Sequence, residues 1–308
     1  FVSIYKKFII LISSIGILFA FSVAGYLTNG FIELKYSSEQ NLIYNKIKSS
    51  PFRKSCHSGD SHYISPENAC TLINGEAPAS WAVFGDSHGV ELSYELGVLL
   101  KNKQNRIRQF TYSGCPPRLN KSSSKVNRSY DCTFWTSSVL EYLLSSDDLK
   151  NIVIIYRLNA YLFGGHERTY PYLPSIVSNE VRDEIFADYV YIINTLAKSG
   201  KNVYVVLPIP ELPNSILNLI SRDNISPLSN INGVDFDWWI RRSNYVNTNL
   251  YKLSNNIKLV NPADLFCSND KCFASINSIP IYFDDNHLST FGASILANAI
   301  ISKSSSNE

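Results

Sequence analysis

The stretch Trp81-Ala82-Val83-Phe84-Gly85-Asp86-Ser87-His88-Gly89 decides how the rest of this 308-residue chain is interpreted. Its first four residues form an apolar run that is typical of a buried strand, and a helix is expected over Gly89–Lys101. Ser87 therefore lies at a strand-to-helix turn, at the edge where open α/β sheets bind ligands. Because N–H groups at a helix start favour developing negative charge, Ser87 is a candidate nucleophile.

A candidate base lies near the other end of the chain. The segment Asp284–Ser289 (DDNHLS) follows a short apolar run and precedes a predicted helix. A carboxylate three residues before a histidine can hold the imidazole in one tautomer and stabilise its cation. Ser87, His287 and Asp284 are therefore predicted to form a catalytic triad, with Asp285 as a competing partner for the histidine.

The same stretch also matches Gly-x-Ser-x-Gly, the nucleophile elbow of α/β-hydrolases. In that fold several strands precede the serine, and the acid and the histidine come from separate loops. Here Ser87 follows the first predicted strand, so the elbow interpretation is disfavoured. We expect Asp86 to accept backbone N–H bonds at the turn and His88 to lie at the surface or cap the helix. A purely helix-capping role for Ser87 is the alternative to catalysis.

The region after residue 78 alternates between short apolar runs and helical segments. Candidate strands are Trp81–Phe84, Arg108–Tyr112, Ile152–Tyr156, Val203–Leu207 and Ile257–Val260, and candidate helices are Gly89–Lys101, Cys132–Leu144, Glu180–Lys198, Asp235–Leu253 and Thr290–Ser302. This alternation predicts an α/β domain with a mostly parallel sheet and helices on both faces.

An apolar run, Phe8–Leu27, precedes this domain and is long enough to cross a bilayer. Lys6 and Lys7 precede the run, which places the start of the chain in the cytoplasm. A cleaved signal peptide is the alternative, although the run is longer than a usual signal core. We expect a transmembrane segment with a cytoplasmic stub (1–30), a linker packed on the domain (31–78) and a catalytic domain (79–308).

The six cysteines fall as near neighbours along the chain. An even count outside the inner membrane favours disulfides, and although fifteen pairings are possible, the local one is expected: Cys56 with Cys70, Cys115 with Cys132, and Cys267 with Cys272. A metal site is the alternative for the linker, because it contains the ligand types Cys56, His57, Asp60, His62 and Cys70. We favour the disulfide and expect no metal.

The formal net charge of +2 gives no sign of the basic stripe of a nucleic-acid-binding protein. The chain instead holds 19 tyrosines and 4 tryptophans. Aromatic rings suit carbohydrate clefts, and one group follows the third predicted strand: Tyr156, Tyr161, Phe163, Tyr170 and Tyr172. Core packing is an equal alternative for this group.

Two of these motifs carry a family resemblance. Gly85-Asp86-Ser87 together with Asp284-x-x-His287 resembles blocks I and V of the SGNH (GDSL-like) hydrolases. With the apolar segment, the cysteine pairs and Gly114-Cys115-Pro116-Pro117, the chain resembles the periplasmic SGNH domain fused to membrane acyltransferase-3 proteins, over roughly Phe8 to Lys303. This resemblance implies an SGNH-hydrolase-like (flavodoxin-like) fold.

The resemblance also implies an oxyanion hole built from the N–H groups of Ser87 and Gly114. The third donor of the family is an asparagine in a Gly-x-Asn-Asp block after the third strand. This chain reads Ile155-Tyr156-Arg157-Leu158-Asn159 there, so Arg157 or Asn159 is expected to replace it. Pairing of Arg157 with a nearby carboxylate is the alternative.

The resemblance implies an acyltransferase that places acetyl groups on a cell-envelope polysaccharide, with lipopolysaccharide O-antigen as the expected acceptor. Acetyl-CoA would be the cytoplasmic donor, acting through a membrane acyltransferase-3 domain fused to this one, and no cofactor is expected to bind this chain. The expected location is the inner membrane, with the globular domain in the periplasm. A carbohydrate acetyl esterase and a non-catalytic glycan-binding module are the alternatives.

Overall fold

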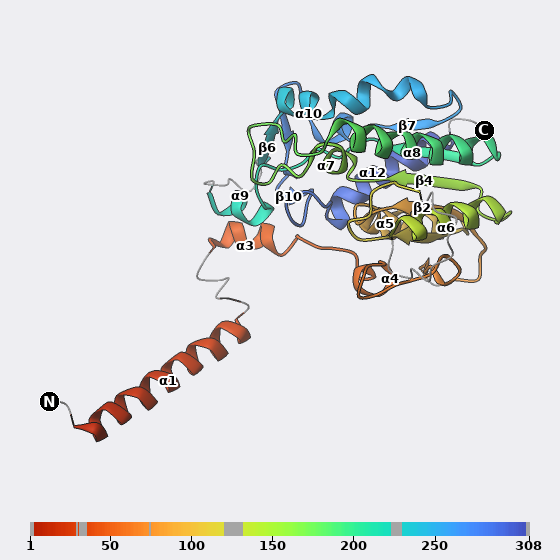
Figure 1. Cartoon of the computed structure of the whole chain (residues 1–308). Helices are drawn as coiled ribbons and strands as arrows, with labels where there is room; N and C mark the ends of the chain where they lie inside the picture. The colour runs from red at the N-terminus through yellow and green to blue at the C-terminus, as the bar shows by residue number, and fades with distance from the viewer. Residues whose placement is uncertain are drawn as a thin grey trace.

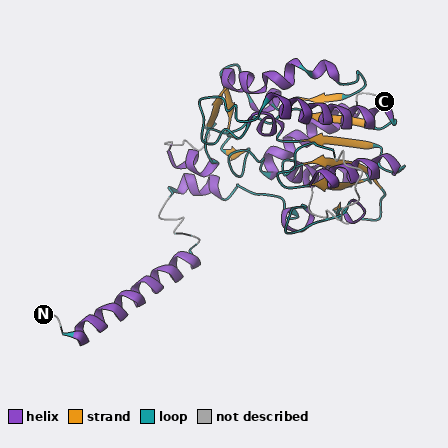
Figure 2. Cartoon of the chain, in the orientation of Figure 1, coloured by secondary structure: helices purple, strands orange, loops and turns teal. Residues whose placement is uncertain are grey.

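The computed structural model describes residues 3–28, 30, 36–73, 75–119, 132–222 and 230–305. Its centre is a sheet of six strands in the order β1 (Thr71–Leu72), β3 (Arg106–Thr111), β2 (Ala79–Gly85), β4 (Asn151–Ile155), β5 (Asn202–Val206) and β7 (Lys258–Val260). Only β1 runs antiparallel to its neighbour, and the other five strands are parallel. The mostly parallel sheet, seen in Figure 2, confirms the predicted fold class.

Alternate residues of each central strand enter two separate cores. Trp81 and Val83 pack on one face with α5 (Gly89–Lys101) and α12 (Thr290–Ser305). Ala82 and Phe84 pack on the other face, which is covered by α6 (Cys132–Ser145), α8 (Asn179–Lys198) and α10 (Phe236–Thr248). Because both faces are buried, the strands are continuous apolar runs rather than alternating ones. Figure 1 shows these helices around the sheet.

The ten elements predicted after residue 78 all occur, with ends shifted by a few residues. The largest shift concerns α10, which ends at Thr248 and is followed by a short 3-10 helix, η2 (Leu250–Lys252). The apolar run forms α1 (Ile4–Leu27), which has a mean hydropathy of 2.4 and buries no residue. It is long and apolar enough to cross a membrane.

Several short elements were not predicted. They are α3 (Ser38–Tyr44), α4 (Arg53–Cys56), η1 (Pro66–Asn68), α7 (Leu158–Phe163), α9 (Ile216–Arg222), α11 (Ala263–Phe266), β1, β6 (Asn232–Asp235), β8 (Lys271–Phe273), β9 (Ser275–Ile276) and β10 (Ile279–Pro280). Strands β6 and β8 form one small antiparallel pair, and β9 and β10 form another. Each of these elements is too short for a hydrophobic period to stand out.

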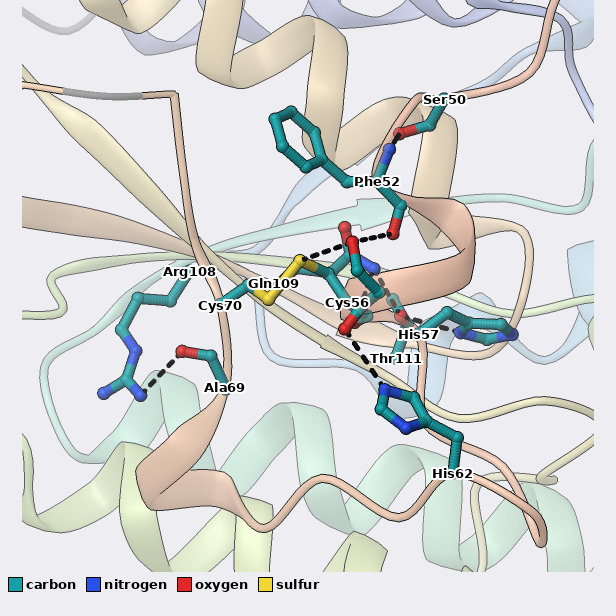
Figure 3. Close-up of a disulfide and its surroundings, with 11 residues drawn as sticks. Ser50, Phe52, Cys56, His57, His62, Ala69, Cys70, Arg108, Gln109 and Thr111 are labelled. Atoms are coloured by element: carbon teal, nitrogen blue, oxygen red, sulfur yellow. Dashed lines mark hydrogen bonds between the residues drawn. A yellow bond between two sulfur atoms is a disulfide. The ribbon is translucent and has the colours of Figure 1, made fainter.

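The described part of the expected linker packs on the domain, with α3 against α9 and β1 as the edge strand of the sheet. Its disulfide, Cys56–Cys70, lies beside β3 (Figure 3). From that strand, Gln109 Nε2 donates to the Cys56 carbonyl at 2.9 Å, and Thr111 Oγ1 lies 2.9 Å from His57 Nδ1. Because both cysteines are in the disulfide, neither is a thiolate ligand for the metal site that was the alternative for this segment. The domain boundaries at residues 30 and 78 stay a prediction.

The other two expected disulfides differ in outcome. Cys267 and Cys272 are joined. The expectation of a Cys115–Cys132 disulfide was wrong, because both residues are thiols in the structure. The buried Cys115 Sγ lies 3.2 Å from the Cys132 carbonyl oxygen and 3.4 Å from Thr136 Oγ1. The Cys115 thiol therefore contacts the first turn of α6 through hydrogen bonds rather than a covalent link.

Candidate active site

The three residues of the predicted triad meet at the carboxyl edge of the sheet. The Ser87 hydroxyl donates to His287 Nε2 at 2.7 Å, and His287 Nδ1–H donates to Asp284 Oδ2 at 2.7 Å. Ser87 follows β2, whereas Asp284 and His287 lie in the loop before α12. Two segments almost 200 residues apart thus form one hydrogen-bonded line from hydroxyl to imidazole to carboxylate. This is the geometry in which a serine is activated as a nucleophile.

The turn that presents Ser87 depends on close packing of β2 against β4. A Cβ atom at Gly85 would lie 1.8 Å from the Ile155 carbonyl oxygen, so only glycine fits there. Asp86 is completely buried next to it and accepts three hydrogen bonds, from the N–H of His88, the N–H of Arg157 and the Tyr161 hydroxyl. Asp86 therefore joins the turn after β2 to the turn after β4, as a structural acceptor.

The histidine loop is organised around the Asp284 carboxylate. Its Oδ1 accepts the N–H groups of Asn286 at 2.9 Å and His287 at 2.7 Å. Burial alone would raise the pKa of Asp284, but the His287 hydrogen bond and charge and these two N–H groups outweigh it and lower the pKa to about 2. The carboxylate is therefore charged at neutral pH and can stabilise an imidazolium.

Asp285 does not compete for the imidazole in the structure. Its side chain accepts from Asn286 Nδ2 at 2.7 Å, and its carbonyl oxygen accepts the N–H of Leu212. The Asp284 carbonyl oxygen likewise accepts the N–H of Ile216. The loop after β5 and the start of α9 thus hold the histidine loop through two backbone hydrogen bonds.

His88 lies at the N-cap position of α5, one of the two places expected for it, but its side chain makes no capping hydrogen bond. It is buried rather than at the surface, and its Nε2 lies 2.9 Å from Asn286 Oδ1. Burial, with contributions from His287 and Arg157 against that of Asp86, lowers the pKa of His88 to about 4. A neutral His88 therefore links the start of α5 to the histidine loop, with its ring 4.9 Å from that of His287.

Two backbone N–H groups are available for an oxyanion. Within the described residues, the structure assigns no acceptor to the N–H of Ser87 or of Gly114. Gly114 follows β3, is exposed, and has a left-handed backbone with φ of +62°. A Cβ atom added at Gly114 would meet nothing within 4 Å. The role of both groups as oxyanion donors stays a prediction.

The two candidates for the third donor have other partners. Arg157 Nε donates to Glu211 at 2.9 Å, and its Nη2 donates to Glu167 at 2.6 Å, which is the carboxylate pairing named as the alternative. Asn159 is 2% exposed, and its amide donates to Ser243 on α10. With its side chain buried and its amide bonded to Ser243, Asn159 gains no support from the structure as an oxyanion donor. Arg157 as a donor stays a prediction.

A buried carboxylate, Glu211, holds Arg157 in place. Burial alone would raise the pKa of Glu211, but Arg242, His166 and Arg157 lower it well below its usual range. Arg242 Nε donates to Glu211 at 3.0 Å, and His166 Nδ1 lies 3.3 Å away. The sequence contained no spacing signal for this cluster, because its members come from four separate segments.

The aromatic group after β4 is mostly packed inside the protein. Tyr156 is buried, Phe163 packs on Tyr245, and Tyr170 packs on Trp238. Tyr161 donates to Asp86, which leaves Tyr172, at 79% exposure, as the exposed ring of the group. The packing alternative therefore accounts for most of these rings.

A family model described as "SGNH domain (fused to AT3 domains)" matches residues 55–302. The chain belongs to this family. The match covers β1 to α12 and includes Ser87, Asp284 and His287. The SGNH fold supports acyl transfer or hydrolysis, the two reactions for which a serine nucleophile is suited. No curated protein matches the chain at a significant level.

One solved structure agrees with this assignment at the level of the fold. The SGNH domain is similar to the periplasmic domain of the lipopolysaccharide acetyltransferase of Salmonella ser. Paratyphi A, with a TM-score of 0.57, 15% identity, and coverage of 87% of this chain and 97% of that chain. A putative acylhydrolase from Bacteroides fragilis is more distant, with a TM-score of 0.41, 12% identity, and coverage of 77% and 91%. At these identities the likeness concerns the fold alone.

Proposed function

We propose that this SGNH domain is an O-acyltransferase that places acetyl groups on hydroxyls of a cell-envelope polysaccharide, with lipopolysaccharide O-antigen as the acceptor. The observation that carries the proposal is the hydrogen-bonded line from Ser87 through His287 to Asp284, in a family fused to AT3 domains. The similar Salmonella domain, which belongs to a lipopolysaccharide acetyltransferase, supports the choice of acceptor.

In the proposed mechanism, Ser87 Oγ attacks the acetyl carbonyl while His287 Nε2 takes its proton. The N–H groups of Ser87 and Gly114 stabilise the oxyanion, and Asp284 stabilises the imidazolium. The donor leaves with the proton from His287, so that Ser87 carries an acetyl ester. A sugar hydroxyl then attacks this ester and gives its proton to His287, which passes it to Ser87 Oγ as the bond between Ser87 and the acetyl group breaks.

The acetyl group would originate from cytoplasmic acetyl-CoA and reach Ser87 through an AT3 domain fused to this one. This supply fits a location in the inner membrane, with α1 as a membrane span and the SGNH domain in the periplasm. Lys6 and Lys7 at the start of α1 support this orientation, because positive charges remain on the cytoplasmic side.

The test is intact-protein mass spectrometry of the full chain in detergent after addition of 4-nitrophenyl acetate. We expect one acetyl mass on Ser87, and its formation should fall by about 10³-fold or more in Ser87→Ala and His287→Ala. Discharge of the acetyl group only when glycan is added would support transfer. Rapid release of acetate without glycan would identify an esterase instead. If Ser87→Ala were acetylated as much as the wild type, Ser87 would not be the nucleophile.

A further inference from the structure

The strongest unexplained contact at the candidate site comes from outside the sheet. Arg53 lies in α4, in the segment between the apolar helix α1 and strand β1. Its Nη2 donates to the Ser87 carbonyl oxygen at 3.0 Å. Its guanidinium carbon also lies 4.9 Å from the centre of the Phe283 ring. This arginine therefore contacts the nucleophile turn and the histidine loop at the same time.

Phe283 transmits the second of these contacts to the imidazole. Its ring stacks on His287 with centroids 5.4 Å apart and an interplanar angle of 9°. Arg53, Phe283 and His287 thus form a continuous stack. An arginine over an aromatic face is attracted by the negative charge density of the ring. The stack limits how far the imidazole can tilt away from the Ser87 hydroxyl.

A buried carboxylate holds Arg53 in this position. Glu91, in the first turn of α5, is 1% exposed. It accepts from Arg53 Nε at 2.8 Å and from Arg53 Nη2 at 2.5 Å. The N–H of Ser50 also donates to Glu91 at 3.1 Å. Because two parallel hydrogen bonds fix the guanidinium plane, the second N–H of Nη2 points at the Ser87 carbonyl oxygen in one orientation.

Resting on the proposed function, we propose that Arg53 is a positioning residue for the acyl transfer and that the linker is part of the catalytic machinery. Arg53 fixes the Ser87 backbone through its carbonyl and the His287 ring through Phe283. It thereby sets the distance and angle of the Ser87–His287 hydrogen bond. Small displacements of reacting groups cost large factors in rate, so loss of Arg53 should slow acylation without changing how the ester binds.

The test compares Arg53→Lys and the double variant R53Q/E91Q with wild type, using the full chain in detergent. Pairing the two substitutions avoids leaving the buried Glu91 carboxylate without its arginine partner. We expect R53Q/E91Q to acetylate Ser87 from 4-nitrophenyl acetate about 10- to 100-fold more slowly, with an unchanged half-saturating ester concentration. Arg53→Lys should recover part of the rate, since an ammonium keeps the charge but loses the planar fork.

Arg182 offers a matched control. Its side chain is exposed to nearly the same extent as that of Arg53, 19% against 22%. It also stacks on aromatic rings, at 5.4 Å from Phe163 and 4.7 Å from Tyr245. Arg182→Gln should keep the acylation rate within about twofold of wild type. An equal loss in Arg182→Gln, or a wild-type rate in folded R53Q/E91Q, would overturn the proposal.

A second measurement decides the role of Arg53 independently of the reaction. Hydrogen–deuterium exchange should become faster in the peptides that contain Ser87 and Phe283–His287 in R53Q/E91Q, and should be unchanged there in Arg182→Gln. If Ser87→Ala were still acetylated, the proposed function would fail while exchange still reported on Arg53. Unchanged exchange at both peptides in R53Q/E91Q would overturn the positioning role.

Discussion

Asp284 and Asp285 are adjacent carboxylates with different partners. Asp284 accepts from the His287 imidazole, whereas Asp285 accepts from the Asn286 side chain. Only the first of these bonds sets which ring nitrogen of His287 carries the proton. The two residues therefore provide their own control for the role of the acid.

We expect Asp284→Asn to slow acetylation of Ser87 by about 10²- to 10⁴-fold, because an amide no longer selects the tautomer in which Nε2 accepts the serine proton. Asp285→Asn should cost less than about tenfold, since its bond does not reach the imidazole. Both rates are measured with 4-nitrophenyl acetate and mass spectrometry. If Asp285→Asn lost more of the acetylation rate than Asp284→Asn, Asp285 would be identified as the partner of His287.

His88 gives the protein a predictable pH dependence. Its pKa is lowered from 6.5 to about 4 by burial, so the folded state releases its proton more readily than the unfolded state. Between pH 6.5 and pH 4 the unfolded state binds more protons, and stability falls as the pH falls. The effect amounts to at most about 1.4 kcal/mol per pH unit for one histidine.

Urea unfolding from pH 7 to pH 4.5 should therefore show a steeper loss of stability in the wild type than in His88→Asn. His57, whose pKa burial also lowers to about 4, leaves part of the slope in that variant. His62→Asn is the control, because His62 is exposed, and should keep the wild-type slope. Equal slopes in wild type and His88→Asn would contradict the assignment of a buried neutral His88.

At the scale of elements, the site depends on how closely β2 approaches β4. The two strands are in register from Trp81 opposite Asn151 to Gly85 opposite Ile155. The turn that follows begins at the position where a side chain would collide with the neighbouring backbone. Gly85 and Gly114 therefore differ in kind, since Gly114 has open space around it but a positive φ.

We expect Gly85→Ala to lower the free energy of unfolding by more than about 3 kcal/mol or to prevent folding, because the added Cβ would lie 1.8 Å from the Ile155 carbonyl oxygen. Gly114→Ala should cost only about 1–2 kcal/mol, the strain of a left-handed alanine. Urea unfolding followed by circular dichroism measures both. Equal losses in the two variants would show that the β2–β4 approach is not limiting.

At the scale of the whole molecule, the parallel sheet brings distant segments together. The loops after β2, β3, β4 and β5 all leave from the same edge of the sheet, since parallel strands share their direction. The linker also reaches this edge, where Arg53 contacts Ser87. The Cys56–Cys70 disulfide fixes the linker, whereas Cys267–Cys272 closes a much smaller loop.

The loop sizes predict how much each disulfide contributes to stability. With sequence separations of 14 and 5, loop-closure entropy gives about 3 kcal/mol for Cys56–Cys70 and about 2 kcal/mol for Cys267–Cys272. C56S/C70S should therefore unfold at lower urea than C267S/C272S, and reductant should destabilise the wild type. Cys115→Ser is the control, because it breaks no covalent link. If reductant still destabilised C56S/C70S/C267S/C272S, the assignment of only these two disulfides would be contradicted.

Much of the fold could be predicted from the sequence because hydrophobic patterning is local. The sequence shows β2 and β4 as apolar runs and α5 as a segment with a helical period, because each pattern depends only on neighbouring residues. The triad was also readable, since Gly85-Asp86-Ser87 and Asp284-x-x-His287 are short motifs at the ends of such elements. Their hydrogen bonds required the fold to bring them within 2.7 Å.

What only the tertiary structure decided are the contacts between segments without a period or motif. Arg53 contacts Ser87, His88 contacts Asn286, and Glu211 contacts Arg157. The two residues of each pair lie 34 or more positions apart in the sequence. The partners of Asn159 and Cys115 were likewise decided by the fold. Asn159 of α7 is buried against α10, where it bonds to Ser243, and the Cys115 thiol bonds to α6. Buried polar groups bond to whatever partner the packing offers, and packing is a property of the whole chain.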